Sequence, residues 1–282
     1  MIHRRPGAVS NAPYVSAGIA VLLVVCAAVA RAVPDAPGNR PTSQTRAVDP
    51  TAPVWLIFID DLHLDFPATG RLKDLFKKVT AELVHEGDLF AVVSTGPAAI
   101  KIDLTGDRGQ LAHALDRIAG AALKPSEILQ PLSETEVRYR AHVTFSTAYS
   151  VMEMLAVVPN KRKAFIYISN GYYFDVGPGT SSDTGRENPF LAAGNEVSLD
   201  HLRAEVAELT RQATRSSVTI FGIDPRGLSG PPTIQPNVND AAWQHYWMTT
   251  RKSLQVISEQ TGGRVIQDDL DGNLKRIVGT MR

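Results

Sequence analysis

The sequence predicts an α/β fold with a doubly wound, mostly parallel sheet, helices on both faces and one antiparallel edge strand. Two observations predict it. Unbroken apolar runs, typical of strands buried on both faces, occupy 54–59, 89–93, 164–168 and 218–223. Segments with apolar residues at helical spacing lie between these runs. Because strands and helices alternate along the whole body, a parallel sheet covered by helices is the arrangement that buries both.

The first half of the body contains three predicted strands. The strand at 54–59 is followed by a helix with apolar residues at helical spacing over 72–83. The strand at 89–93 comes next. The run at 99–104 alternates apolar and polar residues, which predicts the antiparallel edge strand. A further helix is expected to begin near Thr105.

The rest of the body contains three long segments without periodicity. Residues 121–140 are weakly patterned and are expected to form a loop before a helix that ends near Pro159. Two loops rich in Gly, Pro and Asn are expected at 175–197 and 227–240. A helix, a short strand at 264–266 and a last amphipathic helix close the chain.

Composition and charge limit the possible functions. Of 282 residues, 44% are hydrophobic and 21% charged, as in globular proteins. Lys+Arg and Asp+Glu both count 29, and this balance argues against a protein that coats nucleic acid. The single cysteine, Cys26, lies in the N-terminal segment. Disulfides, thiolate metal sites and cysteine nucleophiles are therefore excluded from the rest of the chain.

Residues 1–32 have the pattern of an export signal. His3-Arg4-Arg5 precedes an apolar run at 15–30, which is short for a spanning helix. We expect a cleaved signal peptide, with an uncleaved membrane anchor as the first alternative and lipidation at Cys26 as the second. Each alternative places the body outside the cytoplasm, in the periplasm or the extracellular space. Residues 33–53 are rich in Pro and polar residues and are expected to form a disordered linker to a domain at 54–282.

Polar residues follow several of the predicted strands. Ligands of open parallel sheets bind outside the carboxyl ends of the strands, so these residues form a candidate binding rim. Its members are Asp60, Asp61, His63, Asp65, Asn170 and Asp224. Such a set of oxygen donors suits a hard divalent cation. The alternative for each residue taken singly is a role as a turn former or a helix cap.

Several segments resemble the von Willebrand factor type A family, especially the VWFA-related proteins that bacteria export. The matching segments are 58–63, which ends the first strand, 86–92, 221–228 and 260–264. The similarity extends over about residues 54–280. The resemblance implies a type A fold and a protein-binding function centred on a metal-ion-dependent adhesion site.

The resemblance also implies which residues would form that adhesion site. The first aspartate falls on Asp60, the threonine on Thr144, and the last aspartate on Asn170. The two serine positions fall on Leu62 and Leu64, which offer no ligand oxygen. We therefore expect a degenerate site that binds Mg²⁺ or another divalent cation weakly or not at all, and no firm cofactor.

Two alternatives for this site remain open. Ser146 or Thr147 replaces Thr144 if the register of the helix differs. A shifted metal site would use Asp61, His63 and Asp65.

Known catalytic signatures are absent from the sequence. There is no His-x-x-x-His pair, no Gly-x-Ser-x-Gly elbow and no phosphate-binding Gly-x-x-x-x-Gly-Lys loop. Trp243, Tyr246 and Trp247 lie at helical spacing and are expected to face the core, with an exposed partner-binding patch as the alternative.

We accordingly expect an exported protein-binding module without enzymatic activity. Its partner is another protein, it does not bind nucleic acid, and it contacts a membrane only through an uncleaved N-terminal segment. The alternatives are an envelope hydrolase that uses Asp60, Asp61 and Asp224, and a passive structural module.

Overall fold

A computed structural model describes residues 52–64, 69–122, 134–159, 161–176, 198–229 and 240–282. Within these residues a six-stranded sheet has the order β3-β2-β1-β4-β5-β6. The strands are β1 (Val54–Ile59), β2 (Leu89–Ser94), β3 (Lys101–Thr105), β4 (Lys163–Ile168), β5 (Val218–Ile223) and β6 (Val265–Ile266). All neighbouring strands pair in parallel except β2 and β3, which are antiparallel. The predicted fold class is confirmed, including the antiparallel edge strand.

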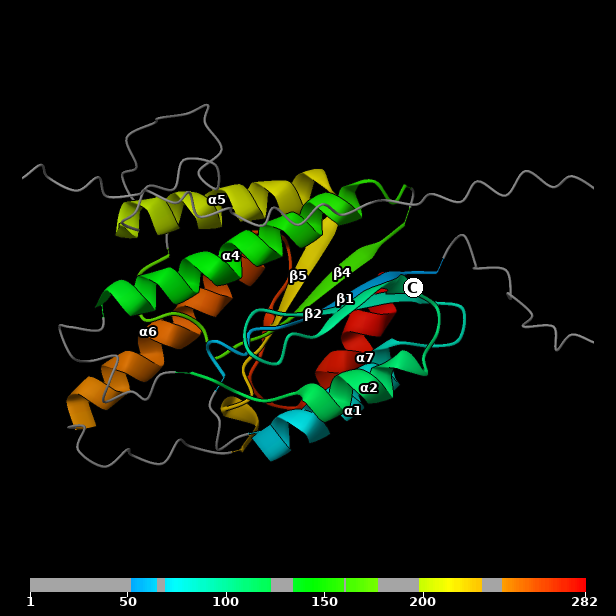
Figure 1. Cartoon of the computed structure of the whole chain (residues 1–282), viewed down its shortest axis with the longest axis horizontal. Coiled ribbons are helices and arrows are strands. Elements are labelled where there is room, and N and C mark those ends of the chain that lie inside the picture. Colours follow the sequence, from blue (N-terminus) through cyan, green and yellow to red (C-terminus); the bar gives the residue numbers. More distant parts are fainter. Residues whose placement is uncertain (1–51, 65–68, 123–133, 160, 177–197, 230–239) are drawn as a thin grey trace, which may run out of the picture. The chain divides into compact units, whose positions relative to one another are not determined.

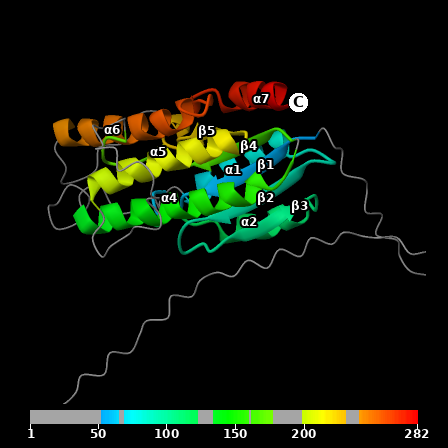
Figure 2. The same cartoon turned by 90° about the horizontal axis from the view of Figure 1, so that it is seen from above.

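Helices cover both faces of the sheet (Figure 1). They are α1 (Thr69–Leu83), α2 (Gln110–Arg117), α4 (Glu134–Ala156), α5 (Leu199–Arg215), α6 (Asp240–Glu259) and α7 (Leu270–Met281), with a 3₁₀ turn, η3 (Gly227–Ser229). Helices α1, α2 and α7 pack on one face, and α4, α5 and α6 pack on the other. Figure 2 shows α4 and α5 running side by side.

The central strand β1 explains why both faces are covered. Its six side chains are all buried, and successive side chains point to opposite faces. Trp55, Ile57 and Ile59 enter the core under α1, α2 and α7. Val54, Leu56 and Phe58 enter the core under α4, α5 and α6. An unbroken apolar run is what a strand with two buried faces requires.

The structure corrects one expectation about the chain between the two halves. Residues 134–140 belong to α4, where the sequence predicted a loop over 121–140. This first part of the helix is polar, so it lacks the apolar period on which the prediction depended. It is stabilised instead by ion pairs at i,i+4 spacing, Glu134 with Arg138 and Glu136 with Arg140. The two glutamates also lie in the first turn, where the helix dipole favours negative charge.

The N-terminal predictions lie largely outside the described residues. The expected signal or anchor at 1–32 and residues 33–51 of the expected linker belong to that part, whereas Ala52 and Pro53 are buried. Among the residues that the structure describes, no helix combines the length and the apolarity needed to cross a bilayer.

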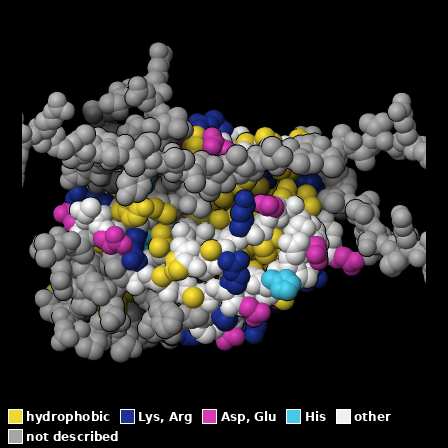
Figure 3. Space-filling model, viewed as in Figure 1, with side chains coloured by type: hydrophobic (Ala, Val, Ile, Leu, Met, Phe, Trp, Pro, Cys, Tyr) yellow, Lys and Arg dark blue, Asp and Glu magenta, His cyan; other side chains and the backbone are white. Residues whose placement is uncertain are grey.

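Charges of both signs are mixed on the surface. On the described part of the face in Figure 3, basic and acidic side chains lie among apolar ones without separating into single-sign areas. This agrees with the balanced composition. No broad single-sign area is therefore seen on the described part of this face.

Gly222 in β5 sets how closely α6 approaches the sheet. A Cβ at this position would lie 2.9 Å from Leu254 Cγ, 2.9 Å from Ser258 Oγ and 3.0 Å from Val265 Cγ2. All of these atoms belong to packed side chains, two of which are fully buried, so the space cannot open without moving α6 or β6.

We expect Gly222→Ala to lower the free energy of unfolding by about 1–3 kcal/mol, the usual cost of overpacking a core. The control is Gly279→Ala in α7, where a Cβ would meet no atom within 4 Å. That change should be neutral or stabilising, because Ala favours a helix by up to about 1 kcal/mol over Gly. Urea denaturation of both variants measures the difference, and equal stabilities would contradict the packing argument.

Candidate functional site

Parallel register brings three strand ends to one edge of the sheet, here called the carboxyl edge. Ile59, Ile168 and Ile223 end β1, β4 and β5 and are aligned in register. The next backbone amides continue the ladder, with Asp60 N donating to the carbonyl of Ile168 at 2.9 Å. Asp60 and Asp224, which follow β1 and β5, are both fully buried.

The Asp60 carboxylate is the centre of a hydrogen-bond network. Its Oδ1 accepts hydrogen bonds from His63 Nδ1 at 2.9 Å, Thr144 Oγ1 at 3.1 Å and Thr95 Oγ1 at 3.2 Å. Its Oδ2 accepts from Ser169 Oγ at 2.8 Å and from the Tyr172 hydroxyl at 2.9 Å. Five donors therefore occupy both oxygens of one buried carboxylate.

This network keeps Asp60 ionised. Burial by itself raises the pKa of Asp60, but the His63 imidazole and the hydroxyls of Ser169 and Tyr172 lower it, and the net pKa lies below the ordinary value. The same charge acts on its neighbours. Burial and the nearby Asp60 carboxylate raise the pKa of Tyr172 well above its ordinary value, so its hydroxyl stays a donor.

Of the three residues considered for the threonine position, Thr144 is the one that the structure bonds to Asp60. It is fully buried on the face of α4 that packs against the sheet. The Thr147 hydroxyl instead donates to the carbonyl of Val143 within the same helix. Ser146 accepts a bond from Ser150 through its carbonyl.

Asp61 holds the loop between β2 and β3. Its Oδ1 accepts from the amides of Thr95 at 2.9 Å and Gly96 at 2.6 Å, and its Oδ2 accepts from the amide of Ala98 at 2.9 Å. Burial raises the pKa of Asp61, while these amides partly offset the effect. Asp61 therefore acts as a structural acceptor for backbone groups, which leaves it poorly placed for a shifted metal site.

The remaining predicted rim residues have separate environments. Asp224 forms an ion pair with the Arg226 guanidinium at 2.9 Å. Arg226 also donates to the backbone carbonyl of Asn170, so its side chain ties the ends of β4 and β5 together. His63 is the rim residue with some exposure, at 14% of its side chain. Asp65 lies outside the described residues.

The donor set does not fit the metal centre that the resemblance implies. Both oxygens of Asp60 are engaged by protein donors, and the Thr144 hydroxyl is directed at Asp60 as one of them. Leu62 and Leu64 carry no oxygen in their side chains, and Leu64 is part of the apolar core. A divalent ion would have to displace several of these donors and would find few oxygens in return.

Three members of the network were not predicted from the sequence. Thr95, Ser169 and Tyr172 bond to Asp60 from segments far from it in sequence. Each lies within a few residues of the end of a strand. A polar residue just after a predicted strand is therefore the sequence pattern that could have identified them. The backbone also contributes, because Gly171 has φ +77° and its missing Cβ would meet the carbonyl oxygen of Thr250 at 1.9 Å. Only glycine lets the chain turn here and bring Tyr172 over Asp60.

A hollow lies beside this network, between α4 and α6. It is open to solvent and small, with room of about 20 Å³ for the centre of a water-sized sphere. Its aromatic wall is formed by Tyr172, Tyr173, Phe174 and Tyr246. Arg140 and His63 add polar groups, and Arg140 is itself fixed by bonds to Glu136 and to the carbonyl of Ala121.

The aromatic residues of α6 divide between core and surface. Trp243 and Tyr246 are buried and stack with ring centroids 5.5 Å apart, as expected for a core-facing stripe. Trp247 is partly exposed and lies under the Arg251 guanidinium, 4.1 Å from its ring centroid. Met248 beside it is 58% exposed.

Comparisons with known proteins give structural neighbours only. No family model and no curated protein matches the sequence. A solved structure of an aerotolerance-related membrane protein from Bacteroides fragilis, with multiple mutations to serines, matches 82% of this chain and 98% of its own at 14% identity and TM-score 0.41. The TFIIH p34 N-terminal domain matches 82% of this chain and 99% of its own, at 12% identity and TM-score 0.35. Human COPII-coat protein Sec24c matches 81% of this chain and 32% of its own, at 11% identity and TM-score 0.35. Similarity at this level assigns neither a partner nor an activity.

We expect Asp60→Ala to lower the free energy of unfolding by about 3 kcal/mol or more, because five donors, three of them buried, lose their acceptor. Asp60→Asn should cost less, since one carbonyl oxygen and the side-chain shape remain. The exposed Asp74→Ala in α1 is the control and should change stability by no more than about 0.5 kcal/mol. Chemical denaturation measures all three. An Asp60→Ala variant as stable as the control would show that the network does not support the edge.

Mg²⁺ should bind too weakly to occupy the protein stoichiometrically. Where the Mg²⁺ concentration only equals the dissociation constant, the gain in stability is about 0.4 kcal/mol, so the thermal midpoint should barely move. Calorimetric titration and thermal unfolding with Mg²⁺ or a chelator check this expectation. Tight binding that Asp60→Ala abolishes would contradict it.

Proposed function

We propose that the chain is an exported protein-binding module of the type A class that recognises another protein at the carboxyl edge of its sheet, without a bound metal. The aromatic hollow between α4 and α6 is the observation that carries this proposal. Aromatic residues and arginine are enriched where proteins bind one another, because they bury large areas and still offer polar contacts.

The surroundings of the hollow support a macromolecular partner. Tyr139, next to the lining residues Val137 and Arg140 on α4, is 55% exposed. A small hollow with an aromatic wall suits a small apolar side chain of a partner, with further contacts around it. The expected rim loops at 175–197 and 227–240 lie mostly outside the described residues.

The rim chemistry favours this function over the hydrolase alternative. Asp60, Asp61 and Asp224 are fully buried, and each carboxylate is engaged by donors of the protein. A general acid or base must reach its substrate within hydrogen-bond distance, directly or through one water. These carboxylates stabilise the edge, whereas the aromatic side chains face the hollow.

Export is part of the proposal and rests on the sequence. The basic start and apolar run of residues 1–32 support secretion or anchoring at the envelope. A protein partner in the periplasm or outside the cell follows from that location.

Site-specific photo-crosslinking in the native host tests the proposed surface. A crosslinking residue at Tyr139 or at the partly exposed lining residue Leu62 should capture the same partner protein. The control position is Val157, which is 65% exposed at the other end of α4. Because aromatic anchors often contribute 2 kcal/mol or more, Tyr173→Ala should reduce capture by about 30-fold.

The capture should also be insensitive to chelation of divalent ions. Equal crosslinking from Val157, or no partner from either edge position, would contradict the proposal. Capture that requires Mg²⁺ would return the function to a metal-dependent adhesion site.

A further inference from the structure

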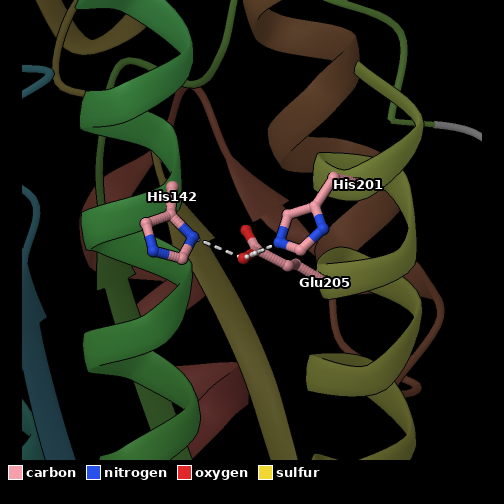
Figure 4. A group of neighbouring side chains, drawn as sticks. All are labelled: His142, His201 and Glu205. Carbon is pink, nitrogen blue, oxygen red and sulfur yellow. Dashed lines mark hydrogen bonds and ion pairs between the residues drawn. The ribbon is translucent and has the colours of Figure 1, made fainter. Parts of the chain in front are cut away.

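Helices α4 and α5 bring two histidines and one glutamate together, away from the Asp60 network. His142 comes from α4, and His201 and Glu205 come from α5 (Figure 4). Figure 4 shows both imidazoles directed at the Glu205 carboxylate between the two helices. One ligand atom from each residue lies within 4.8 Å of the other two.

We propose that His142, His201 and Glu205 form a binding site for a divalent transition-metal ion, of the kind that Zn²⁺ represents. Two imidazoles and one carboxylate are a ligand set that zinc takes in proteins, with a fourth position left for water or another ligand. Imidazole donors favour zinc, copper, nickel or iron over magnesium and calcium, which prefer oxygen.

The state of Glu205 is the first argument. It is fully buried, and both imidazoles are directed at the same oxygen, with His142 Nδ1 at 2.5 Å and His201 Nε2 at 3.1 Å from Oε1. Its other oxygen, Oε2, is buried and has no hydrogen-bond partner among the described residues. A buried carboxylate oxygen without a partner is costly, and a cation that contacts both carboxylate oxygens of Glu205 would compensate it.

The spacing of the ligand atoms is the second argument. Nitrogen and oxygen ligands about 2.0–2.1 Å from a tetrahedral zinc lie about 3.3 Å apart. The 3.1 Å separation between His201 Nε2 and Glu205 Oε1 is already close to this value. The distance between His142 Nδ1 and Glu205 Oε1 has to increase by less than about 1 Å. A small rotation of the partly exposed His142 ring allows this change.

Access and charge agree with a cation. The side chains of His142 and His201 are 18% and 20% exposed, so an ion can enter from solvent while the carboxylate stays buried. A cation that enters between the two rings would lie next to the Glu205 carboxylate.

Local sequence explains two of the three ligands. His201 and Glu205 are separated by four residues in a helix and so lie on one face. Ser198 caps that helix by accepting from the amide of His201 at 3.1 Å, which fixes the first turn where His201 lies. His142 comes from a helix more than fifty residues earlier, so no local motif reveals the third ligand.

Isothermal titration of the purified chain with Zn²⁺, without an added histidine tag, tests the proposal. We expect one ion per chain at neutral pH, where the imidazoles can release their protons to the metal. Glu205→Gln preserves the shape of the side chain but removes its charge. Since loss of groups that merely support ligands costs 10–100-fold, removing a ligand should weaken binding by about 100-fold or more.

His113→Ala is the matched control, because His113 is exposed on α2 and belongs to no cluster. It should bind Zn²⁺ like the unmodified chain. Thermal unfolding gives a second measurement, in which Zn²⁺ should raise the midpoint of the unmodified chain and of His113→Ala but not of Glu205→Gln.

His142→Ala, which changes a partly exposed ring, keeps the test valid if Glu205→Gln does not fold. Co²⁺ in place of Zn²⁺ adds a spectrum that reports its coordination directly, and both ligand variants should lose it. Unchanged Zn²⁺ affinity in the ligand variants, an equal loss in His113→Ala, or no binding to the unmodified chain would overturn the proposal.

Discussion

The carboxyl edge depends on one buried charge, the Asp60 carboxylate. An ionised carboxylate inside a protein is stable only where hydrogen bonds or charges replace its lost hydration. Here the donors come from four separate segments: the turn after β1, the end of β2, helix α4 and the end of β4. Satisfying this one group therefore fixes the relative positions of the elements that form the edge. Three of these segments, the turn after β1, helix α4 and the end of β4, also line the adjacent hollow together with α6.

The network supports the proposal that the carboxyl edge is organised without a divalent ion. A metal would draw a carboxylate and hydroxyls together through its own charge. In this chain Thr144, Ser169 and Tyr172 donate their hydroxyl protons to the carboxylate instead. On the proposal that no ion binds, the edge presents no residual positive charge to an acidic partner group. Recognition would depend on the shape and aromatic character of the hollow, which is a different kind of specificity from that of a metal-dependent site.

Sequence patterns predicted the fold because its determining features are local. Strands buried on both faces, such as β1, appear as continuous apolar runs, and β3 shows the alternation of an edge strand. The start of α4 was missed because its stability comes from charged pairs such as Glu136 with Arg140. The site could be predicted only in part. Asp60 and Thr144 followed from the resemblance, but the bond from Tyr172 depends on a turn at Gly171 and on packing against α6.

Helix α4 takes part in both proposed sites, yet its geometry keeps them separate. His142 and Thr144 are two residues apart, and at about 100° per residue their side chains leave the helix in nearly opposite directions. Thr144 accordingly meets Asp60 at the sheet, while His142 meets Glu205 of α5. No residue of the Asp60 network is bonded to the His142 cluster among the described contacts. Metal binding at the helices and partner binding at the edge can therefore be altered by different substitutions, and evidence for or against one does not decide the other.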